Sequence, residues 1–300
     1  MAVIEVRNLH KRYGETVAVD DVSFSVERGE IFGILGPNGA GKTTTVECIE
    51  GLRSPDGGTV RVLGFEPRED QLRQLVGAQL QESALPEKLE VREALELYAS
   101  FYRNPADPDA LLAELGMTGH QHKPYKKLSG GQKQRLSIAL ALIGNPEIAV
   151  LDELTTGLDP QARRDTWDLV EAIRDRGVTV VLVTHFMAEA ERLCDRIAVI
   201  DSGRVVAVDT PGGLVDRVSA DTTLRFRPSA PFDDHLLTDL PEVREVRRHN
   251  SQVTVTGSGN LLHAVAAVLA RHQIVAADLR VEQASLDDAF VALTGRAFDN

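Results

Sequence analysis

A glycine-rich turn between an apolar run and a helical stretch constrains this fold more than any other feature. Residues 36–43 read GPNGAGKT, which matches the pattern GxxxxGKS/T, and they follow an apolar run at 31–35. Glycines in such a turn let successive backbone N–H groups converge on one anion at the start of a helix. A glycine-rich turn with an incidental lysine is the alternative, but strand, spacing and helix together favour a loop that holds phosphate.

The loop also predicts how a nucleoside triphosphate is held. We expect Lys42 to reach the β and γ phosphates and the Thr43 hydroxyl to bind Mg²⁺. The expected nucleotide-binding residues of the loop are Gly36, Asn38, Gly39, Ala40, Gly41, Lys42, Thr43 and Thr44. The loop by itself leaves open which nucleotide is bound and what its hydrolysis drives.

Apolar patterning predicts an α/β protein with additions. Continuous apolar runs separated by helical patterns are typical of parallel strands covered on both faces. These runs are residues 31–35, 148–151, 178–183 and 197–200. Alternation at 2–7 and 17–27 indicates an N-terminal antiparallel subdomain, and helical spacing at about 84–145 indicates an inserted helical subdomain. Residues 1–215 should form this domain, and residues 216–300 a small α+β domain with the order βαββαβ and a final helix.

Composition limits the partners that such a chain can have. The 300 residues carry a formal net charge of -12, which would repel the phosphate backbone of a nucleic acid. No run approaches the ~18 apolar residues of a membrane-spanning helix. We therefore expect any action at a membrane to go through a partner. Cys48 and Cys194 lie far apart on predicted helices, where buried thiols are more common than a disulfide.

Two adjacent carboxylates end the apolar run at 148–151. Strand ends are where α/β proteins present ligand groups, and successive side chains of a strand point in opposite directions. We expect Asp152 to support Mg²⁺ and Glu153 to act as general base for the water that attacks the γ phosphate. Two solvated carboxylates that cap the next helix are the alternative.

A second glycine-bearing helix start follows in the stretch LSGGQ at 128–132. Ser129 and Gln132 fit a capping box ahead of an apolar helical stripe, which alone predicts a well-started helix. Gly130 and Gly131 weaken the first turn, so their presence favours a helix tip that a ligand approaches closely. The four residues Ser129, Gly130, Gly131 and Gln132 therefore predict a second anion-binding site.

With these motifs, the first 215 residues resemble the ATP-binding cassette (ABC) family, whose signature is LSGGQ. The resemblance implies a P-loop NTPase fold of the ABC type that hydrolyses ATP with Mg²⁺. It also implies a dimer, either with a second copy of this chain or with a different cassette. In such a dimer the phosphate loop of one subunit and the signature of the other enclose each ATP.

The resemblance implies roles for further residues. Tyr13 falls where an aromatic ring stacks on adenine, and Gln81, with Gln79 as the alternative, falls where a glutamine senses Mg²⁺ and water. Asp159 matches the loop that crosses to the opposite subunit, and His185 matches the switch histidine that contacts the γ phosphate. Simpler roles are an apolar filler for Tyr13, a helix cap for Asp159 and a surface position for His185.

The resemblance completes the expected catalytic set but includes one departure. The expected catalytic residues are Glu153, His185, Gln81 and Lys42, and the expected Mg²⁺ ligands are Thr43, Gln81 and Asp152. The family commonly has proline after the catalytic glutamate, where this chain has Leu154. Leucine restores a backbone N–H and loosens the backbone, which puts the positioning of Glu153 in question.

Two stretches refine the function. THFMAEAERLCDRIAVIDSGR, from Thr184, and the ending SLDDAFVALTGR resemble ATP-binding subunits of bacterial drug exporters of the daunorubicin-resistance type. That resemblance implies a separately encoded transmembrane permease, a peripheral place at the cytoplasmic face of the plasma membrane, and drugs, antibiotics or other hydrophobic compounds as cargo. We expect the permease contact at residues 82–91. Residues 216–300 could extend the dimer interface, bind a regulator or dock on the membrane partner, and of these roles we favour dimer support.

Other functions fit the sequence less well. A soluble ABC ATPase acting on ribosomes or DNA usually carries two cassettes or long coiled coils, whereas this chain has one phosphate loop and no heptad run. A GTPase would need a guanine-reading motif of the NKxD kind, and it would leave LSGGQ unexplained. This sequence does not indicate the transported substrate, because we expect the membrane subunit to make the contacts with the cargo.

Overall fold

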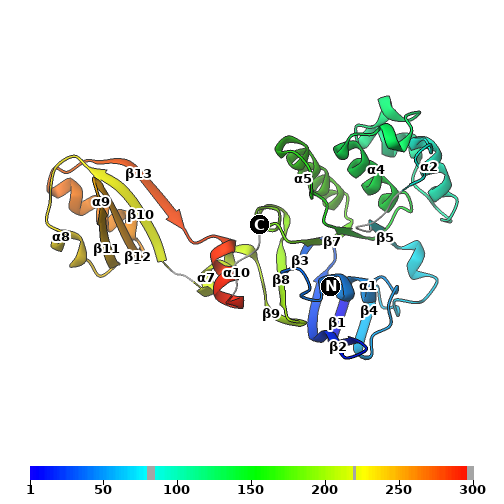
Figure 1. The fold of residues 1–300 in the computed structure, drawn as a ribbon, viewed down its shortest axis with the longest axis horizontal. Helices are drawn as coiled ribbons and strands as arrows, with labels where there is room; N and C mark the ends of the chain where they lie inside the picture. The colour runs from blue at the N-terminus through cyan, green and yellow to red at the C-terminus, as the bar shows by residue number, and fades with distance from the viewer. Residues whose placement is uncertain (80–84, 219–220, 296–300) are drawn as a thin grey trace. The chain divides into compact units, whose positions relative to one another are not determined.

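The computed structural model describes residues 1–79, 85–218 and 221–295 (Figure 1). The chain divides into two compact units, one from Met1 to Pro211 and one from Gly212 onward. Their hydrophobic cores share no residue, so the units have separate interiors. Among the described helices, none has the length and apolar content needed to cross a membrane.

The first unit is built on a nine-stranded sheet in the order β4-β1-β2-β9-β8-β3-β7-β6-β5. Its strands are β1 (Ala2–Tyr13), β2 (Thr16–Glu27), β3 (Ile31–Leu35), β4 (Gly57–Val62), β5 (Val76–Gln79), β6 (Ile148–Asp152), β7 (Thr179–Thr184), β8 (Arg196–Asp201) and β9 (Arg204–Asp209). The strands β8, β3, β7, β6 and β5 pair in parallel, whereas β1 pairs antiparallel with β2 and β4. Every residue of β3, β6 and β7 is buried, which confirms the parallel core expected from continuous apolar runs.

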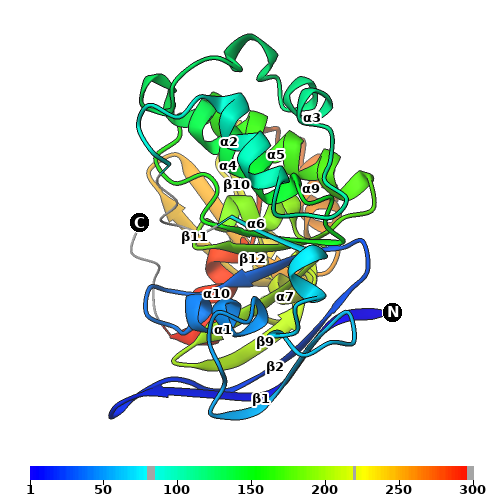
Figure 2. The same ribbon diagram turned by 90° about the vertical axis from the view of Figure 1, so that its right-hand side faces the viewer.

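Helices cover both faces of the parallel strands. The helices of the first unit are α1 (Lys42–Ile49), α2 (Val91–Ala99), α3 (Pro108–Glu114), α4 (Gly130–Leu142), α5 (Pro160–Asp175) and α6 (Met187–Leu193), with short 3₁₀ turns η1 (Leu72–Gln74), η2 (Thr118–His120) and η3 (Tyr125–Lys127). Figure 2 shows α1 on one side of these strands and α4, α5 and α6 on the other. Val46 and Ile49 of α1 share a core with Phe32 of β3 and with Val6 of β1, so α1 joins the parallel core to the antiparallel strands.

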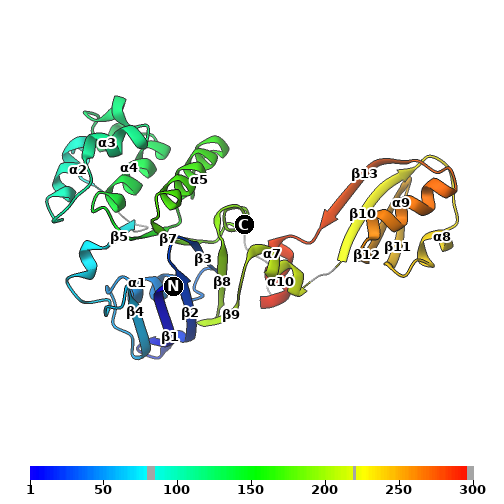
Figure 3. The same ribbon diagram turned by 180° about the vertical axis from the view of Figure 1, so that it is seen from behind.

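The described chain between β5 and β6 contains helices and connecting loops but no strand. It carries α2, α3, η2, η3 and α4, which confirms the inserted helical subdomain. The pairing of Glu90 with Pro124 is an isolated bridge rather than a strand. In Figure 3 these helices lie beyond β5, the edge strand of the nine-stranded sheet.

The second unit has a four-stranded antiparallel sheet in the order β11-β12-β10-β13. Its elements are α7 (Pro211–Val218), β10 (Asp221–Pro228), α8 (His235–Thr238), β11 (Val243–His249), β12 (Gln252–Ser258), α9 (Leu261–Arg271), β13 (Ala276–Gln283) and α10 (Leu286–Thr294). The order β10-α8-β11-β12-α9-β13 is the predicted βαββαβ arrangement, followed by the final helix α10. Leu261, Val265 and Leu269 of α9 are buried against Phe226 and its neighbours, so they form the unit's own core rather than a binding face.

The two cysteines are buried and unbridged. Burial raises the pKa of the Cys48 thiol to about 11 and also raises the pKa of Cys194. Both thiols stay protonated near neutral pH and act as small apolar side chains, as expected from the sequence.

Candidate nucleotide-binding site

The glycine-rich turn connects β3 to α1, as its position in the sequence predicts. Gly41 precedes the first helical residue with φ +101, a left-handed conformation that side-chain-bearing residues rarely adopt. A Cβ at Gly41 would also collide with the carbonyl oxygen of Ala18, and one at Gly36 would collide with that of Ile200. Both glycines are therefore required by the tight course of the turn.

Lys42 is folded back over this turn. Its Nζ donates to the carbonyl oxygens of Gly36 at 2.7 Å and Pro37 at 3.0 Å, and the residue is only 6% exposed. Burial lowers the pKa of Lys42, while the nearby carboxylates of Glu153 and Asp152 act in the opposite direction. The ammonium group thus shares one electrostatic environment with the two acidic residues at the end of β6.

Asp152 closes β6 as a nearly buried carboxyl. Its pKa is raised to about 6, mainly by burial and then by the neighbouring Glu153, while Lys42 and His185 act in the opposite direction. Because the net pKa of Asp152 is raised, the positive charge of Lys42 and His185 does not fully balance the negative charge of Asp152 and Glu153. A cation bound near Asp152 would supply the missing positive charge.

Glu153 and His185 come together from neighbouring strands. His185 follows β7, and its Nδ1 lies 3.1 Å from Oε1 of Glu153. The Glu153 N–H donates to the carbonyl of Val183 at 2.9 Å, and its backbone has φ +47. The sequence argument that strand alternation separates Asp152 from Glu153 was wrong in its cause, because β6 ends at Asp152 and a left-handed backbone sets the direction of Glu153. Leu154 is fully buried directly after it.

The LSGGQ stretch forms the exposed start of α4. Ser129 is the N-cap, its Oγ accepts from the Gln132 N–H at 3.3 Å, and Gln132 Oε1 accepts from the Ser129 N–H at 3.1 Å. The predicted capping box is therefore present. Among the described residues, no hydrogen bond or ion pair joins Ser129–Gln132 to the phosphate loop of the same chain.

The remaining predicted residues have mixed outcomes. Tyr13 is 42% exposed at the end of β1, so its ring is accessible for stacking, with Lys11 Nζ 5.6 Å from the ring centroid. Asp159 caps α5 by accepting from the N–H groups of Gln161 and Ala162, which is the simpler role considered from the sequence. Gln81 lies outside the described residues, and the alternative Gln79 is buried in β5.

Sequence reasoning missed two residues beside the signature. Lys123 Nζ donates to Gln132 Oε1 at 2.9 Å, and His120 Nε2 lies 3.0 Å from Gln132 Nε2. Both belong to the basic stretch HQHKPYKK at 120–127, whose composition was the available signal. Nothing in their spacing indicates which of the basic side chains turns toward α4.

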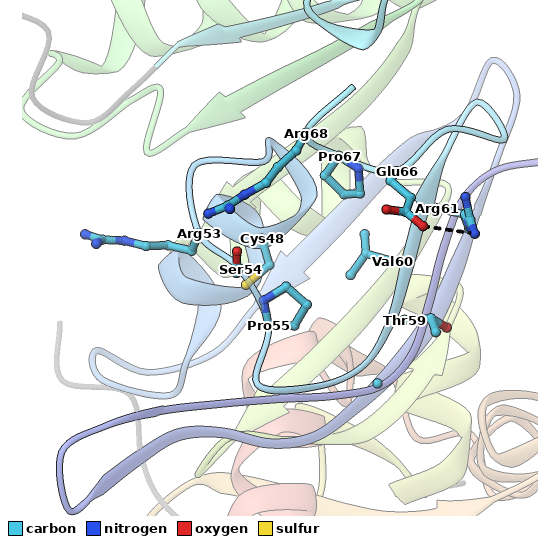
Figure 4. A pocket seen from close by; sticks show the side chains of 11 residues that line it. Cys48, Arg53, Ser54, Pro55, Thr59, Val60, Arg61, Glu66, Pro67 and Arg68 are labelled. Atoms are coloured by element: carbon cyan, nitrogen blue, oxygen red, sulfur yellow. Dashed lines mark ion pairs between the residues drawn. The ribbon is translucent and has the colours of Figure 1, made fainter. Parts of the chain in front are cut away.

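The hollow drawn in Figure 4 is separate from these groups. It has a volume of about 340 Å³ and lies beside α1 and β4, where Arg53, Arg61 and Arg68 line it above Cys48. Arg61 pairs with Glu66 at 3.3 Å. None of the residues around this hollow belongs to the predicted nucleotide site.

Comparison with known proteins identifies the family. Residues 19–156 match the family model described as ABC transporter. The Nod factor export ATP-binding protein I of Ralstonia nicotianae is 36% identical over 302 residues, which cover 98% of this chain and 94% of that protein. The linearmycin resistance ATP-binding protein LnrL of Bacillus subtilis is 33% identical, with 98% of this chain and 99% of that protein covered.

Solved structures agree with this assignment. An ATP-binding subunit of an ABC transporter superposes with a TM-score of 0.65 at 30% identity, covering 72% of this chain and 92% of that one. The dimeric cassette MJ0796 bound to ADP and phosphate gives a TM-score of 0.62 at 28% identity, covering 69% and 98%. Together with the phosphate loop, the acidic strand end and the signature helix, these matches show that the chain belongs to the ATP-binding subunits of ABC transporters and is an ATPase.

Proposed function

We propose that this chain powers a bacterial exporter of drugs, antibiotics or other hydrophobic compounds through a separate transmembrane permease. Two relatives that align with nearly the whole chain carry names from Nod factor export and linearmycin resistance. One name states export and the other states resistance to a compound. They favour an exporter over a cassette that acts on ribosomes or DNA. In this proposal the subunit lies at the cytoplasmic face of the plasma membrane, held there by the permease.

The phosphate loop and the signature at 128–132 lie apart in one chain, and this is the observation that supports two cassettes acting together. The phosphate loop lies with Asp152, Glu153 and His185, whereas the signature begins at the exposed Ser129 and makes no hydrogen bond or ion pair with that loop among the described residues. Each feature is half of a site, so a second chain must supply the other half. A related cassette, MJ0796, has been solved as a dimer in two structures, one of them with ADP and phosphate bound.

Mg²⁺ fits the donors present near the phosphate loop. No cluster of three or more histidine, cysteine, aspartate or glutamate residues forms a closed metal cage in the described chain. An oxygen site with few protein ligands suits Mg²⁺, which usually keeps waters and phosphate oxygens as its other ligands. Asp152, the Thr43 hydroxyl and Gln81 would hold it, and the ion would neutralise charge on the β and γ phosphates.

The chain's own groups divide the hydrolysis step between them. Lys42 leaves the loop carbonyls to bind the β and γ phosphates, and the loop N–H groups orient them. Glu153 accepts a proton from the attacking water, and His185 holds its carboxylate at 3.1 Å. The signature of the second chain closes the other side of the γ phosphate and excludes bulk water.

A hollow beside β5 with apolar side chains among its walls supports a membrane partner. It has a volume of about 210 Å³ and lies between α1 and β5, with Leu52, Leu72 and Tyr102 among its walls. Leu52 in this hollow and Phe101, which precedes Tyr102 in the chain, are 54% and 64% exposed, so both apolar side chains are accessible to a partner. We place the permease here and along residues 85–91; residues 82–84 of the expected contact lie outside the described chain.

Trapping the dimer tests this function. Glu153→Gln should bind ATP but stop hydrolysis, so sedimentation with ATP and Mg²⁺ should show pairs of chains. Lys42→Ala should lose ATP binding and stay single. Glu147→Gln, just before the opposite end of β6, is the matched control and should hydrolyse normally. Normal hydrolysis by Glu153→Gln would remove the assigned base, and a Glu153→Gln protein that never pairs would remove the proposed two-chain site.

A further inference from the structure

The side-chain amide of Gln132 is held at both ends. Its Oε1 faces the Ser129 N–H at 3.1 Å and Lys123 Nζ at 2.9 Å. Its other end, Nε2, lies 3.0 Å from Nε2 of His120. Because two donors already face Oε1, the amide nitrogen must face the imidazole, and His120 Nε2 must accept the hydrogen bond. These three partners allow one orientation of the amide.

This arrangement exceeds what a helix start needs. A capping box requires only the reciprocal bonds between Ser129 and Gln132, and both are present. Lys123 and His120 come from outside α4 and are half-buried beside it, while Ser129 and Gly130 remain exposed. Two additional side chains therefore immobilise a helix tip that is itself exposed to solvent.

We propose that His120 and Lys123 are positioning residues that hold the signature of α4 ready to close on the ATP of a second cassette. The inference rests on the proposed function, because the signature acts only when two chains share a nucleotide. Neither residue needs to touch ATP. They fix the Gln132 amide, and the amide fixes Ser129 through the bond to its N–H, so less motional freedom is lost when the dimer closes.

The backbone around these residues leads toward the proposed permease contact. The carbonyl of Lys123 accepts from the Val91 N–H at 3.3 Å, and the Tyr125 N–H donates to the carbonyl of Leu89 at 2.9 Å. Residues 85–91 are therefore linked to residues 123–125 by backbone hydrogen bonds, and Lys123 is linked to Gln132 by a side-chain hydrogen bond. A shift of this segment when the permease moves would change the hold on the signature.

Pairing of the full-length chain in the hydrolysis-blocked Glu153→Gln background tests the proposal. Lys123→Met and His120→Leu remove one partner of the amide each. We expect either change to raise the ATP concentration for half-maximal pairing about tenfold, the effect of losing one hydrogen bond of this kind at the interface. Binding of a fluorescent ATP analogue to single chains should not change, because the phosphate loop is untouched. Lys123→Arg and His120→Gln keep a donor and an acceptor, and they should restore pairing.

Controls separate positioning from general loss of structure or of charge. His122 pairs with Glu90, and Lys127 is exposed on η3, so His122→Leu and Lys127→Met remove a neighbouring histidine and lysine without touching Gln132. Both should pair like the parent. Gln132→Leu should weaken pairing, and Lys123→Met should add nothing in that background, because Lys123 acts through the amide.

Three results would contradict the positioning role of His120 and Lys123 or the proposed function, each in a different way. If the Glu153→Gln parent pairs and its Lys123→Met and His120→Leu variants pair at the same ATP concentration, the positioning role is wrong and the proposed function stands. If the parent itself never pairs, both fall. An added loss from Lys123→Met in the Gln132→Leu background would show that the lysine acts by another route.

Discussion

At the residue scale, Glu50 is a buried acid whose ionisation opposes folding. It ends α1, and its two carboxylate oxygens are buried without a hydrogen-bond partner in the described chain. Its pKa is raised to about 8, mainly by burial and then by the negative charges of Asp152 and Glu47. A carboxyl whose pKa is higher in the folded than in the unfolded chain binds more protons when folded, so the free energy of unfolding falls as pH rises from about 4.5 to about 8.

Glu50→Gln should remove this pH dependence. Glutamine has nearly the same shape and cannot ionise, so we expect its melting temperature to match the parent near pH 4.5 and to exceed it by at least about 3 °C at pH 9. Thermal unfolding across this range measures the difference. Glu96→Gln, which removes a surface partner of Arg92 and does not act on Glu50, is the control and should show no such gain. An equal gain at every pH would mean that charge on Glu50 is not the cause.

The sequence predicted which residues belong to the site better than it predicted their conformation and their neighbours. Lys42, Asp152 and Glu153 could be placed because a phosphate loop and an acidic strand end leave few positions for them. The φ of +47 at Glu153 could not, because a glutamate carries no preference for left-handed backbone and only the surrounding fold imposes it. The approach of His120 to Gln132 depends on how η2 packs beside α4, which no spacing in the sequence records.

At the element scale, the cap of α5 decides between two interpretations of Asp159. Its carboxylate accepts from two backbone N–H groups, and these bonds lower its pKa. Asp159→Ala should therefore lower the free energy of unfolding by about 1 kcal/mol, whereas Asp159→Ser should keep most of the cap. Chemical denaturation measures both. If Asp159 also contacts a second chain, ATP hydrolysis should fall in both variants. Full activity of Asp159→Ser would instead mean that helix capping is the role of Asp159.

Elements were predictable where their pattern was unambiguous. The strands β3, β6, β7 and β8 follow from continuous apolar runs, because burial on both faces removes the need for polar residues. The long β1 extends to Tyr13 through the polar stretch HKRY, which carries no strand pattern and forms a strand by pairing with β2. Tertiary pairing overrode local composition there.

At the scale of the whole molecule, the separate cores predict that the two units unfold separately. Phe226 is fully buried in the core of the second unit, and that core contains no residue of the first. Phe226→Ala should destabilise the second unit by about 3–5 kcal/mol, the usual cost of emptying such a site. The first unit contains the phosphate loop and the signature, so its affinity for ATP should stay the same.

Calorimetry of the full-length chain distinguishes the two units. We expect two transitions, of which ATP with Mg²⁺ raises only the one that belongs to the first unit, because a ligand stabilises the part that binds it. Phe226→Ala should lower the other transition and leave the ATP-sensitive one in place. Val150→Ala, in the core of the first unit, is the matched control and should lower the ATP-sensitive transition instead. A single transition that both substitutions lower would mean that the units fold cooperatively, and that residues 216–300 support the cassette within one chain rather than between two.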